Sequence, residues 1–421
     1  MKKKIIVAVD PGYDAIKMIV NEHSYQIRNS IVELGSYENL GSSMEDTVIS
    51  EFKKGTRHCI GEVARQKEFE NKEYRKITKD KEAIDLSLTE RFVSDEFQTL
   101  IFSAIGYALI RYSEDNGFGF DIDKYSAYKR NDPNRDTSLD DEFSKIEFIL
   151  GIALPQDKNK ELSPKVKPQF FGLQDFDVET DSGKHHLTFE FKENKENSKA
   201  KKYVYTQSQV QAALLNVMLN KDGSPNGDAD EWQKKNTPAV IIDAGFRTVG
   251  IFELTRTGDI INSESNTDYA MWNIDHAVVD ELISEENEYH LTRDDVYEDA
   301  IELSLRLDEP ISYFKVVDGV KKRFNAPIKD IRDEKIKESC KGLLDYLLGK
   351  FDDFRKTKHI YVTGGTGKIY FKEFETYIKR GYPGLEIDLI ENNVGKENQT
   401  STFGIVSGLY KVLNRLTTEE K

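Results

Sequence analysis

Residues 7–13 (VAVDPGY) and residues 241–249 (IIDAGFRTV) decide the fold of this 421-residue chain. Each stretch ends an apolar run with Asp-x-Gly, which begins at Asp10 in the first and at Asp243 in the second. Another apolar run follows each turn, so both stretches predict a buried strand, a tight turn and a returning strand. One such turn is common. Two of them, each opening one half of the chain, indicate an internal duplication.

Phosphate binding is the chemistry that suits this turn. Glycine lets the backbone approach closely, so that turn N–H groups can point at phosphate oxygens. An aspartate at the strand end can hold Mg²⁺ through water, because Mg²⁺ keeps several of its waters. Lys17 follows Asp10 by seven residues and places an ammonium where it can neutralise a phosphate. Two such hairpins facing each other would clamp a triphosphate from both sides.

Further elements can be placed outward from these two hairpins. Residues 362–367 (VTGGTG) follow a predicted strand and precede a predicted helix, where glycines let a flat base or ribose lie on bare backbone. Residues 97–112 carry apolar side chains at helical spacing and predict a buried helix. Residues 176–180 and 185–191 flank a turn signal and predict a hairpin.

The composition excludes several classes of protein. The chain is 38% apolar and 32% charged, which is enough to bury a core. Its net charge of −15 argues against direct binding to nucleic acid or anionic lipid. Cys59 and Cys340 form no disulfide framework and no zinc spacing. No apolar run approaches the roughly 20 residues of a membrane span, and Asp10 cuts short the one signal-like run, so a cytoplasmic protein is expected.

The order of the motifs resembles the actin/Hsp70/sugar-kinase ATPase superfamily. Five of its segments match in order: phosphate-1 at residues 10–17, connect-1 at 206–211, phosphate-2 at 243–248, adenosine at 362–367 and connect-2 at 404–409. Within the superfamily, the Gly-Tyr-x-x-x-Lys form of phosphate-1 and the short tail after residue 408 are most similar to the ParM/StbA-type bacterial actin-like plasmid segregation proteins.

The resemblance implies an α/β, actin-like fold with two duplicated RNase H-like α/β domains and a nucleotide cleft between them. Domain I would hold residues 1–220 plus 396–421, with a small variable subdomain at about residues 29–94. Domain II would hold residues 238–395, with an outer subdomain at about residues 263–327.

The resemblance also implies roles for individual residues. Asp10 and Asp243 would hold Mg²⁺ through water and serve catalysis. The residues around the phosphates would be Gly12, Tyr13, Lys17, Gly245 and Thr248. The adenosine or guanosine would lie on Gly364, Gly365 and Gly367.

Connect-1 should supply the residue that orients the attacking water. Three glutamines lie in residues 206–211. Gln207 is favoured and Gln209 is second, because the helix proper is predicted to begin near Val210.

The implied function is an Mg²⁺-dependent ATPase or GTPase that assembles into filaments on nucleotide binding and disassembles after hydrolysis. Its expected partners are further copies of itself and a DNA-binding adaptor on a centromere-like site, with no direct contact to nucleic acid or membrane. Two alternatives stay open. One is a small-molecule kinase of the same fold, which would need a general base and a second pocket. The other is a cytoskeletal scaffold actin without a DNA role.

Overall fold

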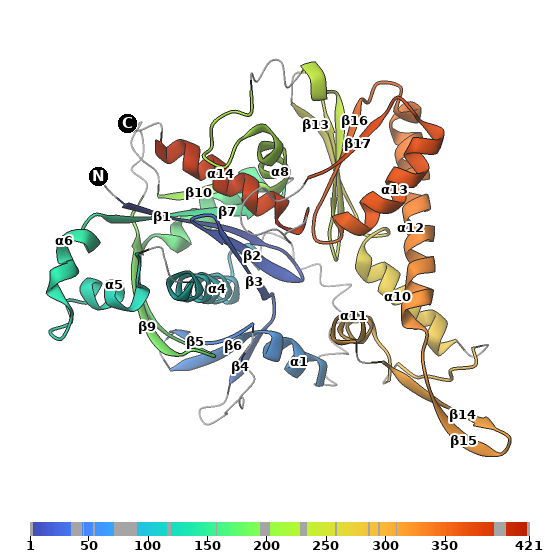
Figure 1. Cartoon of the computed structure of the whole chain (residues 1–421), viewed down its shortest axis with the longest axis horizontal. Coiled ribbons are helices and arrows are strands. Elements are labelled where there is room, and N and C mark those ends of the chain that lie inside the picture. The colour runs from blue at the N-terminus through green and yellow to red at the C-terminus, as the bar shows by residue number, and fades with distance from the viewer. Residues whose placement is uncertain are drawn as a thin grey trace. The chain divides into compact units, whose positions relative to one another are not determined.

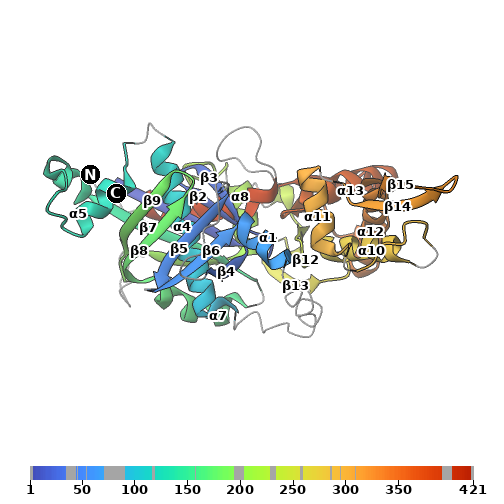
Figure 2. The same cartoon turned by 90° about the horizontal axis from the view of Figure 1, so that it is seen from below.

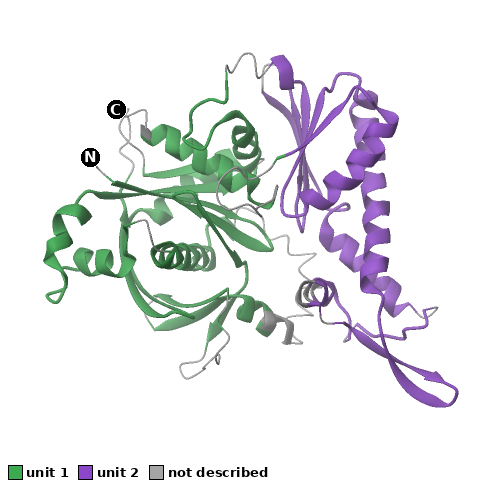
Figure 3. Ribbon diagram, in the orientation of Figure 1, with its two compact units in different colours: residues 1–232, 390–421 green, residues 233–389 purple. Residues whose placement is uncertain are grey.

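The computed structural model describes most of the chain, in these ranges: residues 3–34, 44, 46–53, 55–70, 91–115, 119–156, 158–193, 203–227, 234–256, 259–284, 287–293, 295–308, 310–390 and 401–418. The predicted subdomain at 29–94 and the predicted boundary at 395/396 therefore lie partly outside the described residues. The chain divides into two compact units, residues 1–232 with 390–421 and residues 233–389 (Figure 3). Among the described residues, no helix combines the length and apolar character that crossing a bilayer requires.

The first unit is built on a five-stranded mixed sheet. Its strands, in spatial order, are β10 (Val204–Ser208), β7 (Ile146–Leu154), β1 (Lys3–Pro11), β2 (Ala15–Val20) and β3 (His23–Arg28). β1 runs parallel to β7 and antiparallel to β2. Both faces of β1 and β7 are buried, which is why their sequences are continuous apolar runs rather than alternating ones.

A second five-stranded sheet also belongs to this unit. Its spatial order is β4 (Ile31–Leu34), β6 (Thr56–Gly61), β5 (Thr47–Lys53), β8 (Gly172–Thr180) and β9 (Gly183–Phe191). Helix α4 (Asp95–Glu114) lies between the two sheets (Figure 1) and is buried almost all round, so it carries apolar side chains on every face. The predicted helix at 97–112 and the predicted hairpin are both confirmed.

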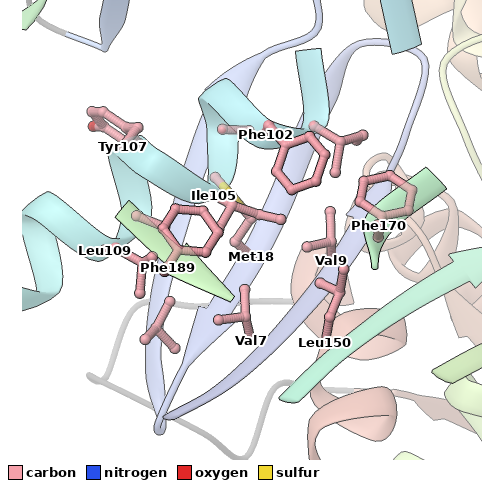
Figure 4. Packing of buried hydrophobic residues seen from close by; sticks show 14 of the residues in the cluster. Val7, Val9, Met18, Phe102, Ile105, Tyr107, Leu109, Leu150, Phe170 and Phe189 are labelled. Carbon is pink, nitrogen blue, oxygen red and sulfur yellow. The ribbon is translucent and has the colours of Figure 1, made fainter. Parts of the chain in front are cut away.

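The main core of the first unit forms around α4. Phe102 and Ile105 of α4 meet Val7 and Val9 of β1 and Phe189 of β9 in one buried cluster (Figure 4). Because interiors are closely packed, this cluster fixes the positions of the strands that carry the turn after β1.

The other helical segments in the described part of the first unit are short except for α14. They are α1 (Glu62–Glu70), α5 (Ile122–Lys129), η1 (Thr137–Leu139), α6 (Asp140–Phe143), α7 (Asn159–Val166), η2 (Lys167–Phe170), α8 (Gln209–Met218), η4 (Ser401–Phe403) and α14 (Gly404–Thr418). Helix α14 packs closely on α8 at Gly408, where a Cβ would lie 1.7 Å from the carbonyl oxygen of Ala212. Glycine is therefore required at that crossing.

The second unit repeats the sheet of the first. Its strands, in spatial order, are β13 (Ile260–Asn266), β12 (Val249–Leu254), β11 (Ala239–Ala244), β16 (His359–Thr363) and β17 (Glu386–Leu389). β11 is antiparallel to β12 and parallel to β16, as β1 is to β2 and β7. The two sheets thus share both strand order and strand direction, which supports the predicted duplication.

The described residues of the second unit also include helical segments, and a hairpin extends beyond them. They are α10 (Met271–Ile283), α11 (Glu298–Leu307), α12 (Ile328–Lys350), η3 (Asp352–Phe354) and α13 (Gly367–Gly381), with the hairpin strands β14 (Ser312–Val317) and β15 (Val320–Asn325). Apolar residues of α10, α12 and α13 join those of β11, β12 and β16 in one core. Cys340 lies in this core, and Cys59 is buried in the first unit.

Candidate functional site

The first turn places a carboxylate and an ammonium side by side. Asp10 is the last residue but one of β1 and pairs in register with Lys17 on β2, so both side chains lie on one face. Asp10 is only 2% exposed. A Cβ on Gly12 would lie 2.8 Å from the carbonyl oxygen of Ala15 and 3.8 Å from the Lys17 Nζ. Any side chain at Gly12 would therefore clash with the Ala15 carbonyl oxygen and strain the turn.

The segment at residues 206–211 reaches the same turn through Gln209. Ser208 caps α8 by accepting a hydrogen bond from the Gln211 N–H, so Gln209 is the first residue of the helix. Its amide Nε2 donates to Asp10 Oδ1 at 3.0 Å. The amide of Gln207, on β10, instead donates to Gln211 Oε1 at 2.7 Å on an exposed surface. Gln209 and not Gln207 thus lies at the carboxylate, which reverses the order of preference drawn from the sequence.

The second turn repeats the geometry of the first. Asp243 pairs in register with Gly250, seven residues later, as Asp10 pairs with Lys17. The N–H of Gly245 donates to the Thr248 carbonyl oxygen at 3.0 Å. A Cβ on Gly245 would lie 2.7 Å from that same oxygen. The two loops therefore have the same length and the same need for glycine, although only the first carries a lysine on its returning strand.

The glycine-rich turn at residues 364–367 is tied to the second hairpin. Gly364 has a φ of +95°, and a Cβ there would lie 2.4 Å from the Ala244 carbonyl oxygen and 2.5 Å from Asp243 Oδ1. The Thr366 N–H and hydroxyl both donate to the Ala244 oxygen, at 3.0 and 2.8 Å. This bare backbone therefore lies directly against the end of β11.

Arg91 contacts the first turn from a distant part of the chain, and the sequence analysis did not predict it. Its guanidinium lies over the ring of Tyr13 at 4.5 Å and donates to the Gly12 carbonyl oxygen at 3.4 Å. Burial lowers the pKa of Arg91, while Tyr13 and the charge of Asp10 act in the opposite direction. An arginine keeps its charge in proteins, so a cation braces this turn from outside the hairpin.

The predicted site residues thus fall into two groups, one in each unit. Asp10, Gly12, Tyr13, Lys17 and Gln209 come together in the first unit. Asp243, Gly245 and Thr248 come together with the turn at residues 364–367 in the second unit.

Each group fits a hydrated Mg²⁺ ion by the kind of donor it offers. Asp10 and Asp243 present carboxylate oxygens, which Mg²⁺ prefers, and each stands at the end of a strand beside a glycine turn. A Cβ at Gly364 would crowd Asp243 Oδ1, so the glycine keeps space beside that carboxylate.

No protein-family model matches the chain, and no curated protein matches it in sequence. Solved structures do match over nearly the whole length. The actin-like protein Alp7A has a TM-score of 0.61 at 15% identity, covering 99% of this chain and 98% of its own. A pCBH ParM described as a non-polymerisable quadruple mutant has a TM-score of 0.57 at 15% identity, covering 97% and 98%. The archaeal actin homologue Ta0583 in complex with ADP has a TM-score of 0.55 at 11% identity, covering 99% and 100%.

These matches assign the fold. The chain has an actin-like α/β fold, and ParM-type bacterial actin-like proteins are among the structures that share it. The predicted fold class and the resemblance are therefore confirmed at the level of the fold.

Proposed function

We propose that this chain is an actin-like nucleotide triphosphatase that assembles into filaments on binding ATP or GTP, disassembles after hydrolysis and serves to segregate plasmid DNA. One observation carries the proposal. The chain has two Asp-x-Gly turns of identical register on two sheets of identical topology, with the Gln209 amide 3.0 Å from the first aspartate. Each of these turns offers a carboxylate beside bare backbone, which suits a phosphate ligand carrying a hydrated Mg²⁺ ion.

The proposed roles follow from the contacts. Lys17 neutralises phosphate charge beside the first turn, and Gln209 orients the attacking water for in-line displacement. Gly12 and Gly245 donate their own N–H groups within the chain, to Asp10 and Thr248, so their role is to keep the turns free of side chains. Bound Mg²⁺ would neutralise the charge that develops on the phosphates. Asp10 and Asp243 would hold its water shell.

Two of the similar structures support this choice among the activities of the fold. Ta0583 was solved with ADP, and the pCBH ParM was described by its inability to polymerise. We extend nucleotide binding and assembly from those proteins to this chain as part of the proposal.

Sedimentation and phosphate release test the proposal together. The purified protein should pellet with ATP or GTP and magnesium, and release phosphate faster once assembled. Asp243→Ala should keep the fold and lose magnesium-dependent hydrolysis, and its filaments should last longer if product release drives disassembly. Asp333→Ala, at an exposed carboxylate of α12, is the control and should behave as the wild type. No pelletable polymer across salt, magnesium and nucleotide conditions would refute the proposal.

A further inference from the structure

The β14–β15 hairpin is a well-defined projection of the second unit. Its turn is Asp318-Gly319, with φ of +53° and +76°, the combination of a two-residue type I′ turn. Six residue pairs follow in unbroken antiparallel register, from Val317 with Val320 to Ser312 with Asn325. Figures 1 and 2 both show the hairpin extending away from α10 and α12.

One face of the hairpin is anchored on its own unit. Tyr313 is buried, stacks on Phe324 at 5.7 Å and meets the edge of Tyr289 at 4.9 Å. On the same face, Lys315 forms an ion pair with Glu288. These contacts fix the direction of the hairpin, so its other face is presented in a defined orientation.

The opposite face combines apolar and cationic side chains. Phe314 is 56% exposed and Val316 is 67% exposed. They pair in register with Arg323 and Lys321, and the Lys321 ammonium lies over the Phe314 ring at 4.6 Å. In the part of the chain that the structure describes, this face is exposed to solvent. Exposed aromatic and aliphatic side chains framed by cations are the composition of a protein contact rather than of a solvated loop.

The charge of the hairpin indicates what kind of partner it binds. Residues 312–325 contain four cations and one carboxylate, a net charge of +3 within a chain of −15, which leaves −18 on the remainder. A basic projection is thus complementary to the surface of the very protein that carries it, and complementary potentials favour and orient association.

We propose that the Phe314/Val316/Lys321/Arg323 face of this hairpin binds an acidic surface of a second copy of the chain and forms a subunit contact of the filament. The inference rests on the proposed function and names the element through which assembly occurs.

A double charge reversal separates assembly from nucleotide binding. Lys321→Glu with Arg323→Glu should raise the protein concentration needed for pelleting by about tenfold or more, because like charges then face each other. Binding of a fluorescent ATP analogue, measured below that concentration, should stay unchanged. Lys356→Glu with Arg380→Glu makes the same change in net charge at exposed cations elsewhere in the unit, and should pellet as the wild type does.

A second variant tests the apolar part without changing charge. Phe314→Ser with Val316→Ser should also impair pelleting. Zero-length carbodiimide crosslinking of mixed isotope-labelled and unlabelled wild type should join Lys321 to a carboxylate of the other copy when nucleotide is present.

The outcomes are distinguishable. Normal pelleting by both hairpin variants overturns this inference alone and leaves the proposed function standing. A wild type that neither pellets nor crosslinks between copies overturns both. Hairpin-dependent binding to anionic vesicles or to duplex DNA at 0.15 M salt, without a crosslink between copies, would assign the face to a different partner and overturn the inference.

Discussion

Gln207 and Gln209 are two residues apart, yet only the second reaches the site. Gln209 opens α8 and donates to Asp10 Oδ1, whereas Gln207 is on β10 and bonds Gln211. A group that orients water acts in the transition state more than in nucleotide binding. Gln209→Ala should therefore slow hydrolysis by about 10²-fold with nucleotide affinity nearly unchanged. Single-turnover phosphate release measures this, with Gln207→Ala as the control. If Gln207→Ala released phosphate slowly and Gln209→Ala released it normally, the water-orienting role would belong to Gln207.

Arg91 braces the first turn by stacking on Tyr13 and donating to the Gly12 carbonyl. Arg91→Ala should weaken nucleotide binding about tenfold, since hydrogen bonds from charged groups contribute about 1.5–3 kcal/mol. Arg91→Lys should not restore affinity fully, because an ammonium lacks the planar, stacking guanidinium. Titration with a fluorescent ATP analogue measures both variants. Arg130→Ala removes an arginine that likewise donates to a backbone carbonyl, that of His186, and should bind normally. Wild-type affinity in Arg91→Ala would show that the brace is dispensable.

The sequence predicts some residues of the site better than others, for a physical reason. Asp10 and Asp243 can be proposed from the sequence because each is the last residue but one of a buried apolar strand, and strand and turn are local features. The position of Gln209 depends on where α8 begins, and Ser208 as the helix N-cap was the available signal. Arg91 has no local signal, because it contacts a turn 79 residues earlier and only tertiary packing brings the two together.

At the scale of elements, α8 and α14 are joined by a buried cation. Lys411 of α14 is 0% exposed, and its Nζ donates to the Asn216 carbonyl oxygen at 2.5 Å, in the last turn of α8. The negative end of a helix dipole suits a cation there. Burial nevertheless lowers the pKa of Lys411 to about 8, and Lys221 acts in the same direction.

This lowered pKa predicts a pH dependence of stability. Between the folded value of about 8 and the ordinary value of 10.5, the unfolded chain binds more protons, so the Lys411 contribution to stability rises with pH across that window. The unfolding free energy of wild type minus that of Lys411→Met should increase by roughly 2 kcal/mol from pH 7 to pH 10. Urea titrations at pH 7, 8.5 and 10 measure it. A constant difference would mean that Lys411 has an ordinary pKa.

Elements with regular local patterns were predictable, and their partners were not. Helix α4 and the β8–β9 hairpin follow from apolar spacing and a turn signal. The sheet that this hairpin joins depends on the pairing of β8 with β5, around Ser50 and Val178. Residues so far apart in sequence leave no periodic trace of their pairing, so the strand order of that sheet required the structure.

At the scale of the whole molecule, the fold is shared with other proteins although the sequence is not. Solved structures at 11–15% identity share the fold over nearly the full length, while no family model matches the chain. The parts that local motifs predict are the ends of β1, β11 and β16, where the fold requires glycine and aspartate.

Binding to DNA depends on the charge of the whole molecule. A protein of net charge −15 repels phosphates, and its basic hairpin carries only +3. The purified protein should therefore show no measurable affinity for random duplex DNA at 0.15 M salt, where exposed charges are screened beyond about 8 Å. A plasmid-segregating filament must then reach DNA through an adaptor bound to a centromere-like site, and that adaptor should recruit filaments to DNA in a co-sedimentation assay. A gel shift with the protein alone, lost in Lys321→Glu with Arg323→Glu, would contradict both the adaptor and the assignment of the hairpin to a second copy.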